Sequence, residues 1–133
     1  MIIKKLLKGK ILFIQLIIIT IGLTWASLAN LNDTVSLEIT FGDKGAHFIA
    51  YFVFALVWFL WLYFSKTCNY SFIKSSLLAV LIGVSYGILM EVLQLTLTTY
   101  RSFDWHDAVA NTIGAISAIV IIRLNKRMIT RLK

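Results

Sequence analysis

The sequence has no proline, a single cysteine and few charged residues, and each shortage excludes a class of protein. Cys68 has no second cysteine to pair with, so a disulfide framework, a CxxC redox pair and a thiolate zinc site are excluded. Charged residues make up 14% of the 133 residues, against about 25% in soluble proteins. Apolar residues reach 59% and the mean hydropathy is +0.86, so the chain lacks the polar residues that would coat a water-soluble surface. The composition indicates an integral membrane protein of one domain.

Four apolar windows approach or reach the length of about 20 residues that a helix needs to cross a bilayer. They cover approximately residues 11–29, 46–64, 73–97 and 106–124. Their apolar runs are continuous rather than alternating, which argues against strands, and the connections are too short for a soluble domain. We therefore predict an all-α protein in which residues 1–133 form a single membrane domain, a four-helix transmembrane bundle.

The first window has some features of a secretory signal, because lysines precede it and the small-residue motif Ser27-Leu28-Ala29 ends it. The apolar run is longer than the 7 to 15 residues or so of a signal-peptide core. We interpret the window as a retained signal-anchor helix.

Basic residues concentrate on alternate sides of the four windows. Eleven of the thirteen lie in the two tails and in the connection between the second and third windows: Lys4, Lys5, Lys8, Lys10, Lys66, Lys74, Arg123, Lys126, Arg127, Arg131 and Lys133. Lys44 and Arg101 fall on the other side. Because Lys and Arg of short loops remain in the cytoplasm, both termini are predicted to be cytoplasmic.

This placement also explains the net charge of +7. The basic tails are expected to contact anionic lipids of the inner leaflet. No nucleic-acid partner is predicted, because no folded basic domain presents the charge.

The acidic residues and histidines lie on the outer side of the predicted bundle or in the outer half of a span: Asp33, Glu38, Asp43, His47, Glu91, Asp104, His106 and Asp107. Polar chemistry is therefore expected at one face of the membrane, while the excess of positive charge lies at the other.

Two polar motifs lie near the outer ends of the second and third windows. Asp43, Lys44 and His47 share one side of a helical turn, with Asp43 and His47 four residues apart. Glu91 and Gln94 lie on one stripe, and Glu91 is about 9 Å below the outer end of its helix. A carboxylate at that depth is costly unless it is paired, neutral or facing a wet cavity, so Glu91 is a candidate functional residue.

A third motif opens the fourth window. Its polar and small residues recur at spacings of three and four and share one helix face: Arg101, Asp104, Asp107, Asn111 and Gly114. This face is expected to point inward, because lipid offers these side chains no hydrogen-bond partners. Gly83 and Gly87 precede Glu91 on the same stripe and predict close helix packing that draws the polar ends together.

Each motif also has a purely structural interpretation. The aspartates of the first and third motifs would cap their helices, and Asn111 would form an interhelical hydrogen bond. Arg101 would pair with Asp104 at the rim. Glu91 fits such a role least, because its own helix offers no positive partner at that depth. Its expected partners come from other segments: Lys44, His47 or Arg101.

In chain order the motifs read Asp43-Lys44-x-x-His47 with Tyr51, Glu91-x-x-Gln94, and Arg101-x-x-Asp104-x-x-Asp107-x-x-x-Asn111-x-x-Gly114. This ordered set, over about residues 40–120, resembles the VanZ-like family of small bacterial membrane proteins. The family commonly has a proline between its Gln and its Arg, which this chain lacks. The founding VanZ protein is associated with resistance to teicoplanin. The resemblance therefore implies an envelope role at the outer leaflet of a bacterial cytoplasmic membrane, with glycopeptide resistance as one form of it.

Two classes of function fit these residues. As a binding module, the outer cluster would hold the headgroup of a lipid-linked wall precursor or of a teicoplanin-like lipoglycopeptide. Arg101 and Lys44 would contact a phosphate. The other polar residues would bond sugar or peptide groups: Asp43, His47, Glu91, Gln94, Asp104, Asp107 and Asn111.

As an enzyme acting on a lipid headgroup, the protein would use His47, oriented by Asp43, as general base and Glu91 as general acid. Arg101 would stabilise developing charge. We favour binding over catalysis, because no nucleophile or metal-ligand spacing in the sequence is diagnostic.

A metal-dependent variant would use the oxygen-rich set Asp104, Asp107, Glu91 and His47, which suits Mg²⁺ or Mn²⁺ better than Zn²⁺. We favour binding without a metal over this variant, so neither a metal nor a cofactor is predicted. A proton-coupled transporter is disfavoured, because Glu91 is the only ionisable residue well inside a predicted span.

Overall fold

The computed structural model describes residues 9–29, 42–99 and 103–133, and for Gly42 and Asp43 it describes the backbone alone. Within this part of the chain the helices are α2 (Gly9–Leu28), α3 (Gly42–Phe64), α4 (Phe72–Leu97), α5 (Trp105–Leu124) and the short α6 (Lys126–Thr130). The described residues contain no strand, which confirms the all-α prediction. The four long helices match the predicted spans to within about one helical turn. The short α6 was not predicted.

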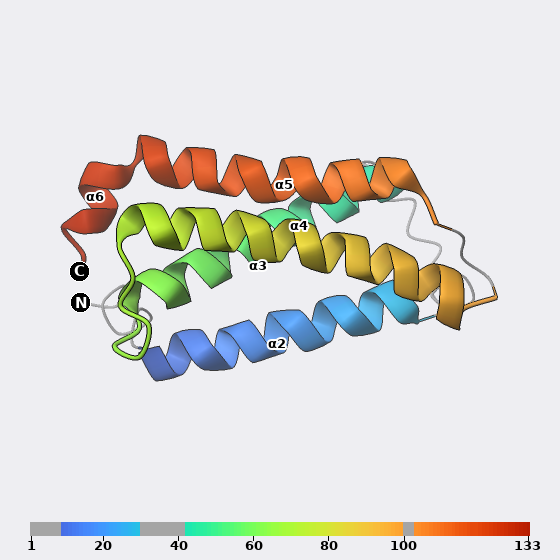
Figure 1. Ribbon diagram of the computed structural model, residues 1–133, viewed down its shortest axis with the longest axis horizontal. Helices are drawn as coiled ribbons and strands as arrows, with labels where there is room; N and C mark the ends of the chain where they lie inside the picture. The colour runs from blue at the N-terminus through green and yellow to red at the C-terminus, as the bar shows by residue number, and fades with distance from the viewer. Residues whose placement is uncertain (1–8, 30–41, 100–102) are drawn as a thin grey trace.

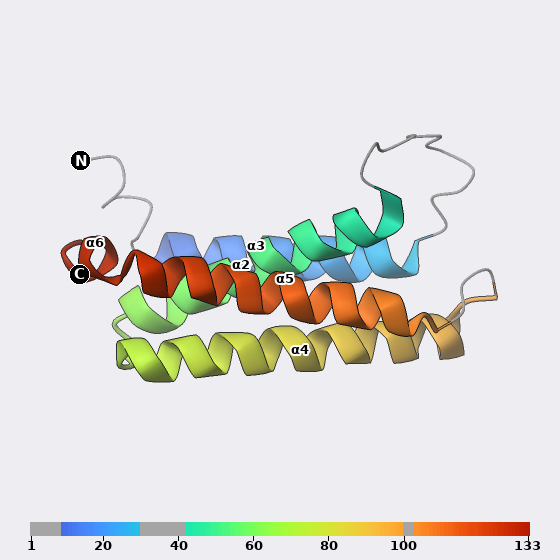
Figure 2. The same ribbon diagram turned by 90° about the horizontal axis from the view of Figure 1, so that it is seen from above.

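The four long helices run side by side, alternately in opposite directions, along the long axis of the molecule (Figures 1 and 2). The start of α2, the connection from α3 to α4 and the short α6 lie together, and we call this the α6 end. At the other end α3 and α5 begin and α2 and α4 finish, and we call this the polar end. The three polar motifs of the sequence therefore come together at one end of the bundle.

The outer faces of the helices are apolar. Ile18, Leu77 and Leu81 are each more than 60% exposed, as large apolar side chains facing lipid would be. All four long helices are long and apolar enough to cross a membrane. This confirms the prediction of a multi-pass transmembrane bundle.

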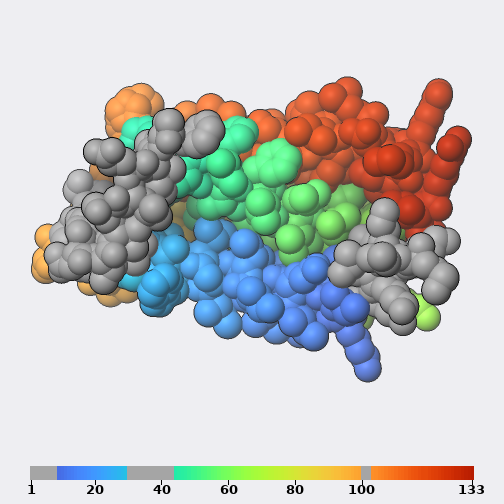
Figure 3. Space-filling view, turned by 180° about the vertical axis from the view of Figure 1, so that it is seen from behind, coloured from blue at the N-terminus to red at the C-terminus, as the bar shows by residue number. Residues whose placement is uncertain are grey.

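Aromatic side chains of α3 fill much of the interior. Phe59 and Tyr63 stack with their ring centroids 5.5 Å apart, and Phe72 at the start of α4 meets both rings edge to face. Nearer the polar end, Phe54 stacks on Tyr86 of α4. The most extensive helix contact is between α3 and α5, while α2 lies alongside α3 on the face shown in Figure 3. The site residues of α3 and α5 therefore rest on the best-packed pair.

Glycines allow α3, α4 and α5 to approach closely near the polar end. A Cβ atom added at Gly83 would lie 3.0 Å from Cβ of Ala115, and one added at Gly87 would lie 3.1 Å from Cβ of Asn111. At Gly114 an added Cβ would overlap the backbone carbonyl oxygen of Phe48. The predicted role of the glycine stripes in close helix packing is therefore confirmed.

Candidate functional site

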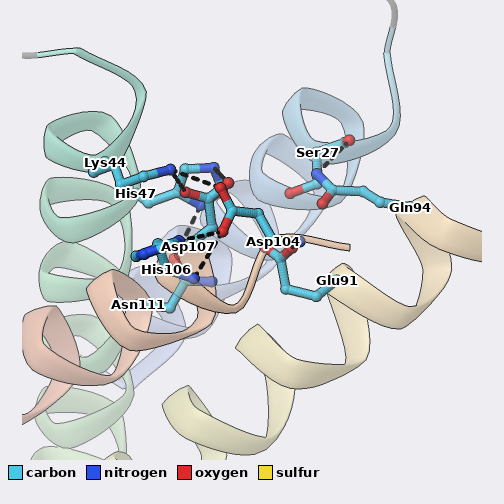
Figure 4. A network of polar contacts seen from close by, with 9 residues as sticks. All are labelled: Ser27, Lys44, His47, Glu91, Gln94, Asp104, His106, Asp107 and Asn111. Atoms are coloured by element: carbon cyan, nitrogen blue, oxygen red, sulfur yellow. Dashed lines mark hydrogen bonds and ion pairs between the residues drawn. The ribbon is translucent and has the colours of Figure 1, made fainter. Parts of the chain in front are cut away.

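Six of the predicted site residues come together at the polar end (Figure 4). Helix α3 supplies two of them, α4 supplies one, and the start of α5 supplies three; we call this set the polar cluster: Lys44, His47, Glu91, Asp104, Asp107 and Asn111. Arg101 lies outside the described residues, and Asp43 lies in the first turn of α3 with its side chain undescribed. The predicted roles of Arg101 and Asp43 therefore stay predictions.

Lys44 forms the rim of the cluster, with half of its side chain exposed. Its ammonium group donates to Asp104 Oδ2 at 2.9 Å and to Asp107 Oδ1 at 2.6 Å. Asp104 also caps α5 by accepting from the backbone N–H of His106 at 2.8 Å. The pKa of the Asp104 carboxyl is held well below its usual range. The hydrogen bond from the Lys44 ammonium is the main cause, and the backbone and ring N–H groups of His106 add to it. Lys44 therefore carries a charge that two carboxylates already balance, whereas the sequence analysis had assigned it to a phosphate.

His47 lies below this rim and is oriented by Asn111. Its Nδ1 is 3.0 Å from Asn111 Oδ1, and its Nε2 is 3.6 Å from Asp107 Oδ2. The side chains of His47 and Asp107 are 12% and 9% exposed, and Asn111 is 1% exposed. This hydrogen bond joins α3 to α5, as the structural interpretation of Asn111 predicted, and it identifies His47 as the partner. The orienting role of Asp43 stays a prediction.

Glu91 is the deepest member of the cluster, at 1% exposure. Its Oε2 accepts a hydrogen bond from the backbone N–H of Asp104 at 3.4 Å, while its Oε1 is buried without a hydrogen-bond partner among the described residues. The Nδ2 of Asn111 and the hydroxyl of Tyr51 are likewise buried and unpartnered there. Both side chains would lie 3.3 Å from a Cβ at Gly87, so they are neighbours. Because buried polar groups are nearly always hydrogen-bonded, this group of unsatisfied atoms requires an explanation.

Three members of the cluster are placed to share a cation. His47, Glu91 and Asp107 each offer one ligand atom, and these atoms all lie within 4.8 Å of one another. Asp104, which the predicted metal-dependent variant also included, is not in this set, and its carboxylate pairs with Lys44 and His106. The described side chains of the cluster thus comprise three carboxylates and one ammonium group, and two of the carboxylates contact that ammonium group.

Gln94 is buried but turns away from the cluster. Its Nε2 donates to the backbone oxygen of Ser27 at 3.0 Å and so ties α4 to α2. The geometry gives Gln94 a helix-packing contact, whereas the sequence analysis had placed it in the ligand site. The acceptor is a backbone carbonyl, which every residue carries, so no residue type in the sequence could have indicated this contact.

Two cavities lie away from the polar end. One, of about 1100 Å³, is at the α6 end and is lined by apolar and basic residues including Phe13, Trp61, Lys10, Lys66 and Lys133. The other, of about 400 Å³, lies between α4 and α5 among mainly apolar residues. Neither is the headgroup pocket that the sequence analysis expected at the polar cluster.

Comparisons with known proteins add a family relationship. The sequence profile of the VanZ/LLP1 family matches residues 5–126, which include the four long helices and the polar cluster. An uncharacterized protein of Schizosaccharomyces pombe is 33% identical over 129 residues, which cover 96% of this chain and 72% of the yeast protein. No solved structure matches the chain. Both similarities therefore extend over nearly the whole chain, and one of them is to a yeast protein.

Proposed function

The chain belongs to the VanZ/LLP1 family, and from this premise we propose that it binds the headgroup of an amphiphile at its polar end. The observation that carries the proposal is the group of buried, unpartnered polar atoms on Glu91, Asn111 and Tyr51. Caps and helix struts satisfy their own polar atoms, whereas a ligand site leaves some of them for the ligand.

The exposure of the cluster supports entry from the membrane surface. Lys44 and Asp104 at the rim are 50% and 36% exposed, whereas Glu91 below them is almost fully buried. A headgroup would meet the rim first, and its tails would lie along the apolar outer faces of the helices. Arg101 is the proposed phosphate ligand, because its two-pronged donors match a phosphate and Lys44 is already paired.

We propose a phosphate-bearing headgroup, which is the chemistry that phospholipids and lipid-linked wall precursors share. The yeast relative favours an amphiphile found in both kinds of cell over a ligand confined to bacteria. Binding of a teicoplanin-like lipoglycopeptide, and with it glycopeptide resistance, is a narrower proposal that rests on the family resemblance. Placement in a bacterial cytoplasmic membrane rests on the same resemblance.

Native mass spectrometry of the full chain, released from mild detergent, tests this function. We expect a wild-type peak that retains one phosphate-containing amphiphile and a mass that identifies its class. A wall precursor and a phospholipid differ in mass and fragmentation, so the spectrum distinguishes the two sources. A chain that carries no amphiphile, or only a broad mixture in proportion to the membrane composition, would contradict the proposal.

The enzyme alternative is supported by one geometric feature. His47 is held by Asn111 and faces Asp107, and Glu91 is close to both, so an acid and a base lie side by side. A retained amphiphile whose mass changes during incubation with the wild-type chain, but not with His47→Gln, would establish catalysis. An unchanged mass supports binding alone.

At the α6 end we propose contacts with anionic lipids. Lys10, Lys66 and Lys133 line the 1100 Å³ cavity together with Phe13 and Trp61, so charge and apolar surface adjoin there. Each basic side chain near an anionic leaflet contributes about 1 kcal/mol of attraction.

The orientation that these lysines imply, with both termini in the cytoplasm, gives a labelling prediction. Cys68 lies in the connection between α3 and α4, and the exposed Thr99 follows the last turn of α4. A membrane-impermeant maleimide added to intact cells is expected to label Thr99→Cys in a Cys68→Ser background and to leave Cys68 of the wild-type chain unlabelled. Labelling of Cys68 with protection at position 99 would reverse the orientation.

A further inference from the structure

We infer that His47, Glu91 and Asp107 bind a divalent cation of the Mg²⁺ or Mn²⁺ type at the polar end. The three ligand atoms come from three different helices and lie within 4.8 Å of one another. In an octahedral site with ligands at about 2.1 Å, atoms on opposite sides of the ion are about 4.2 Å apart. Small side-chain rotations would therefore bring all three atoms to bonding distance.

The unpartnered oxygen of Glu91 is a separate observation in favour of a cation. Glu91 is 1% exposed, its Oε1 has no hydrogen-bond partner among the described residues, and its side chain points from α4 toward the residues of α3 and α5 (Figure 4). An ionised carboxylate in this position needs a compensating positive charge. The Lys44 ammonium does not supply it, because its two described bonds go to Asp104 and Asp107.

The two oxygens of Asp107 divide between two tasks. Oδ1 accepts from Lys44 at 2.6 Å, while Oδ2 faces the His47 ring, with 3.6 Å to Nε2. One oxygen thus anchors the carboxylate and the other is directed toward the proposed ion. The anchored carboxylate is held in place before the ion arrives.

Asn111 completes the arrangement behind His47. With its proton on Nδ1, the imidazole donates to Asn111 Oδ1 at 3.0 Å and carries the Nε2 lone pair on the side of Asp107. Metal-binding histidines usually donate their other ring N–H to an oxygen in this way, which fixes the ring orientation.

The donor set selects the class of ion. Two carboxylates and one imidazole, with no thiolate, favour a hard or borderline cation that keeps water in its other positions. Those positions would be open to phosphate oxygens. The cation site nevertheless stands on its own geometry and does not depend on the proposed headgroup.

Electron paramagnetic resonance with Mn²⁺ tests the site in the full chain, placed in nanodiscs of phosphatidylcholine, which is zwitterionic and has no net charge. We expect one saturable Mn²⁺ per chain, displaced by excess Mg²⁺, and a modulation from one nitrogen ligand in pulsed spectra. Glu91→Gln and Asp107→Asn should each weaken Mn²⁺ binding by at least about tenfold. Ser75→Ala is the control, because the buried Ser75 hydroxyl lies near the start of α4, away from the polar end; its Mn²⁺ affinity should stay within about threefold of wild type.

His47→Gln is expected to remove the nitrogen modulation. If a carboxylate variant does not fold, this spectrum still tests whether His47 is a ligand of the cation. Absence of saturable Mn²⁺ binding by the wild-type chain would overturn the inference. So would unchanged affinity in folded Glu91→Gln and Asp107→Asn, or bound Mn²⁺ without a nitrogen ligand. Loss of the retained amphiphile with Mn²⁺ binding intact would remove the headgroup proposal and leave the cation site standing.

Discussion

Glu91→Gln is expected to lower the amount of amphiphile retained per folded molecule by about tenfold or more. The substitution keeps the shape of the side chain and removes its charge. Hydrogen bonds to a charged group contribute about 1.5 to 3 kcal/mol, and 1.4 kcal/mol corresponds to a factor of ten in binding. The amount of protein in the membrane and its thermal midpoint should remain near the wild-type values, because Glu91 Oε1 has no described partner to lose.

Ser75→Ala is the matched control on the same helix. The Ser75 hydroxyl is also buried without a described partner, but it lies near the start of α4, away from the polar end. Its removal should leave retention unchanged. If Glu91→Gln retains as much amphiphile as Ser75→Ala, Glu91 is not part of a binding site.

Gly114→Ala is expected to destabilise the fold strongly, by about 3 kcal/mol as overpacking in a rigid contact commonly does. The new Cβ would overlap the backbone oxygen of Phe48, and backbone of a packed helix cannot rotate away as a side chain can. The most extensive contact of the bundle, between α3 and α5, would have to open. The measurement is the thermal midpoint and the monodisperse fraction in detergent.

Gly22→Ala is the control for this prediction. Apart from the backbone of its own helix, no atom of the described residues lies within 4 Å of a Cβ at Gly22, and alanine favours a helix over glycine by about 1 kcal/mol. This variant should be as stable as wild type or more so. If Gly114→Ala were equally stable, the close approach of α3 and α5 would be incorrect.

The transmembrane helices could be predicted from the sequence because the bilayer sets their length. The start of α5 was also foreseen in part, because a helix cap was one of the interpretations of Asp104 and the structure shows that cap. The shift of the start of α3 to Gly42 and the short α6 were not foreseen, since polar residues at a membrane surface give no length rule. Helix ends outside the apolar windows depend on local packing.

Helical periodicity in the sequence predicted most members of the polar cluster, but it could not predict which of them contact one another. Periodicity shows that Lys44 and His47 lie on one side of α3, yet it does not show which helix that side meets. The pairing of Lys44 with two aspartates and the contact of Gln94 with Ser27 depend on how the helices are rotated against one another. Such rotations are fixed by close contacts such as that of Gly114 with Phe48.

The most direct test of a single shared site is a double-mutant cycle on His47→Gln and Glu91→Gln, read as amphiphile retained per folded molecule in native mass spectra. Both side chains are proposed to bind one ligand. The double variant should therefore retain about as much amphiphile as the single variant that retains less, which makes the two losses strongly non-additive. Two separate structural roles predict losses that multiply, or retention that falls only with the amount of folded protein. Either of those results would contradict the conclusion that the polar cluster acts as one site.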